Sequence, residues 1–362
     1  MKIAVLPGDD IGPEITEAAV AVLEAADKEF GLKLNLELHE VGMAAHRRCG
    51  TTLPDSAFNA AQAADGVLLG PAGVTNYPAV LDGGINIPAT IRKRLDLFAN
   101  IRPARFRTGL PKSLAGLDCL IIRENKEGFY ADRNFFQGHA EFMPTPDCAI
   151  SMRLVTKAGS RRIAKVAFDF ARARRKHVTM VGKRHVLQMT DGLFMGQARE
   201  EASNYPDVTL REMDIDAMTS ELYLYPEGTD VLLTTNMFGD LLSNLVVALS
   251  GGLGLAAALN VGDRHSAANA GHGSAPDIAG QGIANPTGLI LSAALLLRWF
   301  GQTRSQSEFV AASDAMEAAL DDILNNKAAR TRDLGGAAST VEFANAVRSR
   351  IKAKGHPAGI RN

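Results

Sequence analysis

Residues 3–14 read IAVLPGDDIGPE, and this stretch decides the fold class. The apolar run from Ile3 to Leu6 is rich in strand formers, and the turn signal Pro7-Gly8-Asp9-Asp10 follows it directly. Pro13 then opens a helical pattern that runs to about Phe30, because the missing N–H of proline costs least in a first helical turn. The stretch predicts a strand that passes through a turn into a helix.

The same alternation continues along the chain. Strand-like segments, either apolar or alternating, cover residues 32–38, 66–70, 117–122, 178–181 and 231–235. Helical patterns cover residues 55–64, 157–175, 286–300 and 306–325. Strands that alternate with helices favour parallel pairing, so we predict an α/β architecture.

Length and charge limit the class of protein. The chain has 362 residues, enough for about two domains. Lys and Arg number 39 and Asp and Glu number 40, which argues against a dedicated nucleic-acid binder. The one basic cluster, residues 172–177, is typical of the solvated end of a helix. A hydrophobic content of 46% excludes a disordered chain.

Cysteine usage and the apolar runs indicate the compartment. Cys49, Cys119 and Cys148 are too few and too widely spaced for a disulfide framework or a metal knuckle. The N-terminal apolar run is too short for a signal peptide. The most apolar stretch, Leu289 to Phe300, is too short to span a bilayer. We therefore expect a soluble, cytoplasmic protein with no membrane partner.

One glycine motif is misleading. Residues 252–257 fit the pattern GxGxxA of dinucleotide-binding proteins. That motif needs a strand before it and an acidic residue about 20 positions after it. Here the preceding Leu241 to Ser250 segment is helical in pattern, and no acidic residue has the right spacing. We interpret the motif as a turn that ends a helix.

Three arginines form a candidate cluster. Arg92 and Arg102 flank an apolar segment, and Arg123 follows the strand at 117–122. Each one alone is typical of an ordinary surface arginine. Together they suit a di- or tricarboxylate, because guanidinium groups bind carboxylates with two parallel hydrogen bonds.

Acidic residues follow two other segments. Asp240 comes shortly after the strand at 231–235, where a carboxylate is well placed to bind Mg²⁺ or Mn²⁺. Asp214 and Asp216 offer further oxygen ligands. The same carboxylates are equally compatible with capping helices.

The loop at 271–280 is rich in glycine. Such a loop brings backbone N–H groups close to phosphates. Asp277 is able to accept hydrogen bonds from ribose hydroxyls, and its charge repels a 2′-phosphate. By itself the loop is a weak signal.

Taken together, these segments resemble the β-decarboxylating dehydrogenases, the family of isocitrate, homoisocitrate, 3-isopropylmalate and tartrate dehydrogenases. The resemblance implies two discontinuous α/β domains of the isopropylmalate/isocitrate dehydrogenase type rather than a Rossmann fold. A large cofactor-binding domain is expected over 1–98 and 251–362, and a small domain with the dimer interface over 99–250. The landmarks are residues 6–14, Arg92, 100–103, 123–130, Lys183, 236–240 and 272–280.

The family also implies the chemistry. Each active site of a homodimer is completed by Lys183 and Asp216 of the other chain, with Lys183 as base and Tyr130 as general acid. Arg92, Arg102 and Arg123 bind the substrate's carboxylates. Mg²⁺ or Mn²⁺ is held by Asp216, Asp240 and Asn244. NAD is bound by His185, His272, Gly273, Ser274, Ala275, Asp277, Ile278 and Asn285.

Some residues depart from the family pattern. Asp10 occupies a position that is usually glycine, and His185 stands where many relatives have asparagine. Asn244 replaces an aspartate and Asn269 a glutamate. Residues 85–91, which precede Arg92, match neither the isopropylmalate nor the isocitrate pattern.

The resemblance predicts NAD- and metal-dependent oxidative decarboxylation of a 3-substituted (R)-malate, of the 3-isopropylmalate/isocitrate class. The alternatives are a tartrate- or D-malate-type dehydrogenase and a non-catalytic regulatory subunit.

Overall fold

The computed structural model describes residues 1–110, 112–130 and 140–352, which form two compact units. The first unit contains Met1–Ile87, Arg107–Leu110 and the chain from Ala267 onward. The second contains Pro88–Phe106 and Pro111–Ser266. Each unit is therefore built from separate stretches of sequence. The domain boundaries predicted at 98/99 and 250/251 stay a prediction.

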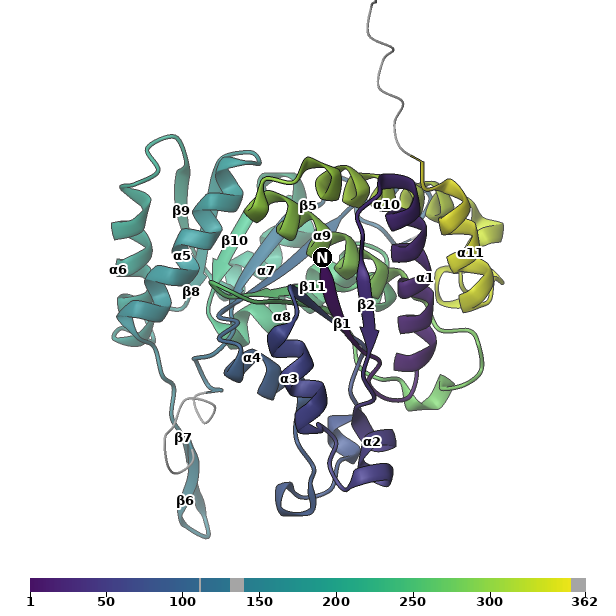
Figure 1. Cartoon of the computed structure of the whole chain (residues 1–362). Helices are drawn as coiled ribbons and strands as arrows, with labels where there is room; N and C mark the ends of the chain where they lie inside the picture. Colours follow the sequence, from purple (N-terminus) through teal and green to yellow (C-terminus); the bar gives the residue numbers. More distant parts are fainter. Residues whose placement is uncertain (111, 131–139, 353–362) are drawn as a thin grey trace, which may run out of the picture. The chain divides into compact units, whose positions relative to one another are not determined.

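The first unit has a parallel sheet in the order β2-β1-β3-β12. Its neighbours β1 and β2 lie side by side in Figure 1. Residues 3–6 of β1 are buried, as an apolar run of strand formers requires. The helix α1 begins at Gly12 with a proline in its first turn and ends at Gly31, which takes the left-handed conformation. Its apolar side packs against α9, α10 and α11. The bounds are β1 (Lys2–Leu6), α1 (Gly12–Phe30), β2 (Asn35–Leu38), α2 (Gly42–Cys49), α3 (Asp55–Ala63), β3 (Gly66–Leu69), β12 (Ser266–Ala270), α9 (Thr287–Arg304), α10 (Ser307–Asn325) and α11 (Thr340–Arg350).

The second unit has a mixed sheet in the order β11-β4-β5-β10-β8-β9. β4 runs antiparallel to both β5 and β11, and the other pairs are parallel. The helix α8 packs beside β5 and α7, and β6 and β7 form a separate antiparallel pair. The bounds are α4 (Ile87–Arg94), β4 (Ala99–Arg105), β5 (Asp118–Glu124), β6 (Glu141–Thr145), β7 (Cys148–Ser151), α5 (Lys157–Arg172), β8 (His177–Gly182), α6 (Thr190–Ala202), β9 (Thr209–Asp214), α7 (Ile215–Leu224), β10 (Val231–Thr234), α8 (Asn236–Leu249) and β11 (Ala257–Val261).

The parallel strands of this second sheet set the place of the site. β5, β10, β8 and β9 are consecutive neighbours, so their carboxyl ends meet at one edge. Thr234 lies opposite Arg123 on one side and Val181 on the other, and Gly182 lies opposite Asp214. Chemically active side chains that follow these strands therefore share that edge, where ligands bind in α/β sheets.

The predicted α/β architecture is confirmed, and every predicted strand and helix is present. The predicted parallel pairing holds for β1 with β2 and β3 and for β10 with β5 and β8. The strand β4, which was not predicted, pairs antiparallel with both of its neighbours. The strand predicted from residue 32 begins at Asn35, and the helix predicted to 175 ends at Arg172. The motif at 252–257 does form a turn after a helix, since α8 ends at Leu249 and Gly252 has a φ of 145°.

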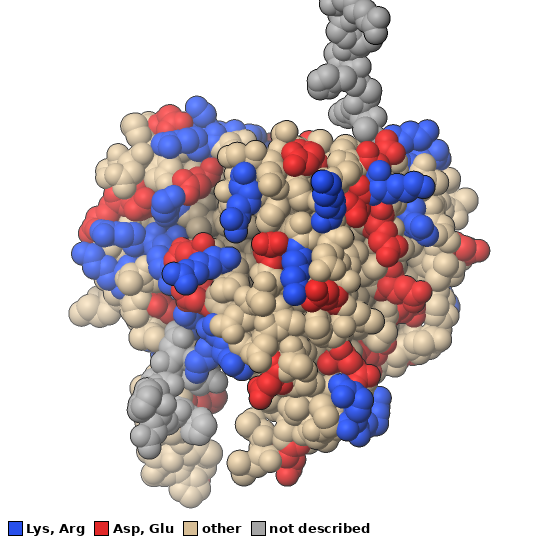
Figure 2. All heavy atoms as spheres, in the orientation of Figure 1, with Lys and Arg blue, Asp and Glu red and all other residues tan. Residues whose placement is uncertain are grey.

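The basic cluster follows the end of α5, as predicted, and pairs with acidic residues. Arg174 Nε contacts the buried carboxylate of Asp230 at 2.7 Å. On the face shown in Figure 2, Lys and Arg side chains are interspersed with Asp and Glu. Among helices in the described ranges, none has the length and apolar character needed to cross a membrane. Cys49, Cys119 and Cys148 are all free thiols.

Candidate active site

Two buried arginines and one carboxylate form the centre of the candidate site. Arg102 on β4 and Arg123 on β5 are 7% and 3% exposed. Asp240 Oδ1 on α8 accepts a hydrogen bond from Arg123 Nη1 and lies 3.5 Å from Arg102 Nη1. Asn236 Oδ1 accepts from Arg123 Nε and Nη2 at 3.1 and 2.7 Å, and Ser243 Oγ accepts from Arg102 Nη1 at 2.7 Å. The sequence places these groups together because β4 and β5 are paired and α8 follows β10.

The charges of this centre do not balance. Burial and the positive charge of Arg123 lower the pKa of Arg102 to about 10, although Asp240 opposes the shift. Burial also lowers the pKa of Arg123. A pKa near 10 still leaves Arg102 charged at neutral pH. Two buried cations therefore face one carboxylate, and a bound anion would offset the remaining charge.

Tyr130 lies beside the same centre. The guanidinium of Arg123 is 6.0 Å from the centre of the Tyr130 ring. The loop that carries Tyr130 follows β5 and is anchored by a backbone bridge, in which Gly128 and Leu154 donate to each other at 2.7 and 3.0 Å. Tyr130 is thus held near a cation, and its ring is half-buried.

Lys183, at the end of β8, belongs to a second charged group. Its ammonium donates to Asp216 and, at 3.4 Å, to Asp214. His185 Nδ1 lies 2.9 Å from Asp214 Oδ2. The hydrogen bond with Asp216 raises the pKa of Lys183 and lowers the pKa of Asp216. In the single chain, Lys183 is therefore a charged ammonium held between two carboxylates.

The remaining predicted metal and substrate residues lie on helices. Asp240 is inside the first part of α8 and bonds to an arginine, so the interpretation as a helix cap is wrong for it. Asn244 follows one turn later, is exposed and shares a helix face with Asp240. Asp214 stands at the N-cap position of α7 but makes no capping side-chain bond. Arg92 lies on α4 and is half-buried.

The glycine-rich loop of the first unit has features that suit a nucleotide. His272 Nδ1 lies 3.0 Å from the carbonyl of Gly273, and burial lowers the pKa of the ring. The other ring nitrogen, Nε2, is buried and has no hydrogen-bond partner among the residues that the structure describes. Ala275 has a φ of 44°. The loop thus holds a neutral imidazole with one nitrogen that lacks a protein partner, which is uncommon for a buried polar atom.

Two further predicted cofactor residues flank this loop. Asn285 donates through Nδ2 to Asp333 Oδ2 at 2.9 Å, so its amide is held in one orientation. Asp277 lies in a one-turn 3₁₀-helix, Pro276–Ile278, and is exposed. The backbone N–H of Ile11 donates to the carbonyl of Ser274 at 3.1 Å, which fixes the loop against the turn before α1.

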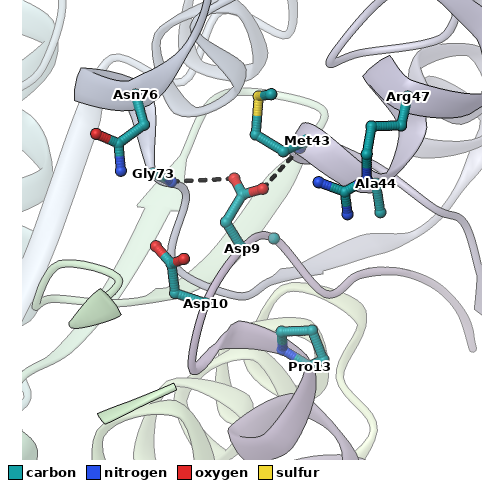
Figure 3. Close-up of a pocket in the computed structure, with 9 residues that line it drawn as sticks. Asp9, Asp10, Pro13, Met43, Ala44, Arg47, Gly73 and Asn76 are labelled. Atoms are coloured by element: carbon teal, nitrogen blue, oxygen red, sulfur yellow. Dashed lines mark hydrogen bonds between the residues drawn. The ribbon is translucent and has the colours of Figure 1, made fainter. Parts of the chain in front are cut away.

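Asp9, to which no role was assigned from the sequence, joins separate segments of the first unit. Its carboxylate accepts from the N–H of Met43 at 2.7 Å and from the N–H of Gly73 at 3.0 Å (Figure 3). It also accepts from the hydroxyl of Tyr77 at 2.5 Å. Three segments distant in sequence are thereby joined. Asp10, beside it, has a φ of 53°, a conformation that aspartate accepts more readily than most residues.

Asp9 also lines a pocket of about 180 Å³ in the first unit (Figure 3). The pocket lies beside the turn that precedes α1. The only sequence feature that pointed to this pocket was its turn, Pro7-Gly8-Asp9-Asp10. It is lined by Gly8, Asp9, Asp10, Pro13, Met43, Ala44, Arg47, Gly73 and Asn76.

Comparisons with known proteins agree with this geometry. A family described as isocitrate/isopropylmalate dehydrogenase matches residues 2–347, so the chain belongs to this family of hydroxy-acid dehydrogenases. A 3-isopropylmalate dehydrogenase from Archaeoglobus fulgidus is 39% identical, with 96% of this chain and 98% of that protein covered. An isocitrate/homoisocitrate dehydrogenase from Thermus thermophilus is 38% identical, with 97% and 98% covered. The crystal structure of isocitrate dehydrogenase from Methylococcus capsulatus has a TM-score of 0.85 at 37% identity, covering 97% of this chain and 99% of that one.

Proposed function

We propose that this chain catalyses NAD- and divalent-metal-dependent oxidative decarboxylation of a 3-substituted (R)-malate to a 2-oxo acid, CO₂ and NADH. The observation that carries the proposal is the buried pair Arg102 and Arg123 beside Asp240. Their excess positive charge suits a substrate with two or more carboxylates. The relatives named above act on substrates of this class according to their names.

The residues present fit both groups that the reaction needs. Both arginines contact Oδ1 of Asp240, so the other carboxylate oxygen is the one available to Mg²⁺ or Mn²⁺. The proposed ligand set also includes Asn244 and the Asp216 of a second chain. Within the described chain, no three His, Cys, Asp or Glu side chains gather as a metal site. The unsatisfied Nε2 of His272 suits a nucleotide of either kind. The acidic Asp277 favours NAD over NADP, because its charge repels a 2′-phosphate.

The chain's own residues would divide the work as follows. Arg92, Arg102 and Arg123 bind and orient the carboxylates. Bound NAD would supply the hydride acceptor for C2, and a bound divalent cation would supply Lewis acidity at the 2-oxygen. Lys183 assists removal of the hydroxyl proton. After the bond between C3 and the β-carboxylate breaks and CO₂ leaves, Tyr130 donates a proton to C3.

A homodimer with shared active sites is part of the proposal. Lys183 and Asp216 would then serve the partner's site. Exposed apolar side chains on the second unit support such an interface, because large apolar groups are costly to leave in water. The most exposed of them on β6, β7, α7 and α8 are Phe142, Met143, Ile150, Tyr223, Leu224 and Leu241. A cytoplasmic location, in keeping with the three free thiols, also belongs to the proposal.

The test is NADH formation with Mn²⁺ or Mg²⁺ across D-malate, tartrate, isocitrate, homoisocitrate and 3-isopropylmalate, with NADP⁺ as a control. We expect fast NAD-linked turnover of one acid. Arg123→Met should lower kcat/KM by at least a hundredfold, about 3 kcal/mol, because a charged hydrogen-bonding group is lost. Arg161→Met, which removes only an exposed pair with Glu200, should not change it.

Other outcomes distinguish the alternatives. Turnover confined to D-malate or tartrate would identify a tartrate- or D-malate-type dehydrogenase, which lacks a large 3-substituent pocket. No turnover with any of the five acids, together with retained binding of isocitrate or NADH, would support a regulatory subunit. In that case Asn244→Asp restores the charge that this chain lacks beside Asp240.

A further inference from the structure

A buried ion pair lies outside the proposed catalytic groups but contacts the segments that carry Lys183, Tyr130 and Asp240. The side chain of Arg153 is 7% exposed and that of Asp191 is fully buried, and Nη1 and Oδ1 are 2.6 Å apart. Arg153 lies in the extended segment between β7 and α5, whereas Asp191 lies in the first turn of α6. A buried pair of this kind is often no more stabilising than two apolar side chains of the same volume. Stability alone therefore does not explain its presence.

Asp191 holds the backbone of the proposed base. Its Oδ2 accepts a hydrogen bond from the N–H of Lys183 at 2.6 Å. The carbonyl of Lys183 accepts in turn from the N–H groups of Val186 and Leu187 at 3.0 and 2.8 Å. One buried carboxylate thus fixes the point at which the chain leaves β8, and so the direction in which the Lys183 side chain starts.

Arg153 connects this carboxylate to the segments of the same chain that carry Tyr130 and Asp240. Its Nη1 donates to Thr190 Oγ1 at 2.7 Å and its Nη2 to Thr235 Oγ1 at 3.1 Å, immediately before α8. The guanidinium also lies 5.7 Å from the ring of Phe129 and 5.4 Å from the ring of Phe238. Phe129 precedes Tyr130, and Phe238 is two residues from Asp240.

The backbone beside Arg153 makes the same connection. Leu154, the next residue, forms the two-bond bridge with Gly128 that anchors the Tyr130 loop. A planar guanidinium with five donors is suited to link three segments at fixed angles, whereas a lysine ammonium is not. We propose that Arg153, paired with Asp191, is a positioning residue that holds the Lys183 segment, the Tyr130 loop and the start of α8 in their working arrangement.

The inference rests on the proposed function and is tested through kinetics of the full-length protein. Arg153→Met and Asp191→Asn should each lower kcat at least thirtyfold. The double variant should be no slower than the slower single variant, because both substitutions disrupt one unit. Arg153→Lys should recover part of the loss.

The matched control is Arg161→Met, on α5, whose 53% exposed side chain pairs with Glu200 at 2.9 Å. It should keep kcat within twofold. A folded Arg153→Met variant with kcat within threefold of wild type would overturn the inference, as would single losses that multiply in the double variant. If Arg153→Met does not fold, Arg153→Lys decides: kcat equal to wild type would count against a positioning role.

A second measurement separates this inference from the proposed function. Hydrogen exchange of the Lys183 amide reports on its bond to Asp191 whether or not any acid is turned over. Wild-type protein that is inactive on all five acids would refute the proposed function alone. Protection of the Lys183 amide should fall at least tenfold in Arg153→Lys relative to both wild type and Arg161→Met. Unchanged protection would refute the inference even if the enzyme is active.

Discussion

Replacing Glu124 with glutamine should change how stability depends on pH. Glu124 ends β5, next to Arg123, and the residue is only 4% exposed. Its two carboxylate oxygens accept from the N–H groups of Lys126 and Glu127 at 2.8 and 2.7 Å. Burial nevertheless raises the pKa of Glu124 to about 7, from an ordinary 4.5. The cost of burying the charge outweighs the stabilisation by these hydrogen bonds.

The sign of the effect follows from the raised pKa. The folded protein binds the proton of Glu124 more tightly than the unfolded chain does. The resulting stabilisation is complete below about pH 4.5 and is lost as the pH rises to about 7. A shift of this size corresponds to about 3 kcal/mol. Wild type should therefore lose up to about 3 kcal/mol across this window through Glu124 alone.

Glutamine removes the titration but keeps the shape. Its amide oxygen can replace one acceptor, while its NH₂ group faces a backbone donor, at a cost of about 1–3 kcal/mol. Glu124→Gln should thus be less stable than wild type at pH 5 and should equal or exceed it by pH 8. The measurement is urea unfolding of both proteins at intervals from pH 5 to pH 8, with Glu141→Gln on the exposed strand β6 as control. A difference in unfolding free energy that stays constant with pH would refute the reasoning.

Three other substitutions test separate parts of the molecule. Asp277→Lys should raise the ratio of kcat/KM for NADP⁺ to that for NAD⁺ at least tenfold, because a cation replaces the charge that repels a 2′-phosphate; an unchanged ratio would place Asp277 away from the ribose. Asn244→Asp should lower the Mn²⁺ concentration for half-maximal activity about tenfold, since it adds a hard anionic ligand; equal metal dependence would show that residue 244 does not ligate. Asp9→Asn should lower the free energy of unfolding by about 1–3 kcal/mol in urea titrations, because one of three buried hydrogen bonds loses its acceptor; an unchanged midpoint would contradict that role.

Local patterns were sufficient for much of the fold. The strand and helix of residues 2–30 were predictable because an apolar run, a turn and a proline at the helix start are all short-range signals. β4 was missed, although it carries Arg102, because Pro103 and two arginines within Ala99–Arg105 obscure its apolar pattern. Its antiparallel direction depends on partners on β5 and β11, and the latter lie about 160 positions away.

The candidate site, like the fold, was predictable only in part. The residue types of the site were named from the sequence through the family resemblance, but their contacts were not. Asp9 joins Met43, Gly73 and Tyr77 across 34 to 68 positions, and no periodic pattern encodes such contacts. The buried pairing of Arg153 with Asp191 was equally unpredictable, because an isolated arginine or aspartate is most often a surface residue. Burial, which distinguishes them, is a property of the assembled structure.

The discontinuity of the first unit affects how the protein is made. Glu14, in the first turn of α1, accepts from the N–H of Ala284 at 3.0 Å and from the hydroxyl of Thr340. α1 also packs on α11, near the other end of the described chain. A ribosome therefore releases the first strand and helix long before their packing partners exist. The apolar side of α1 therefore lacks these packing partners while more than 250 further residues are synthesised. We expect the nascent chain to depend on chaperones that shield its N-terminal segment.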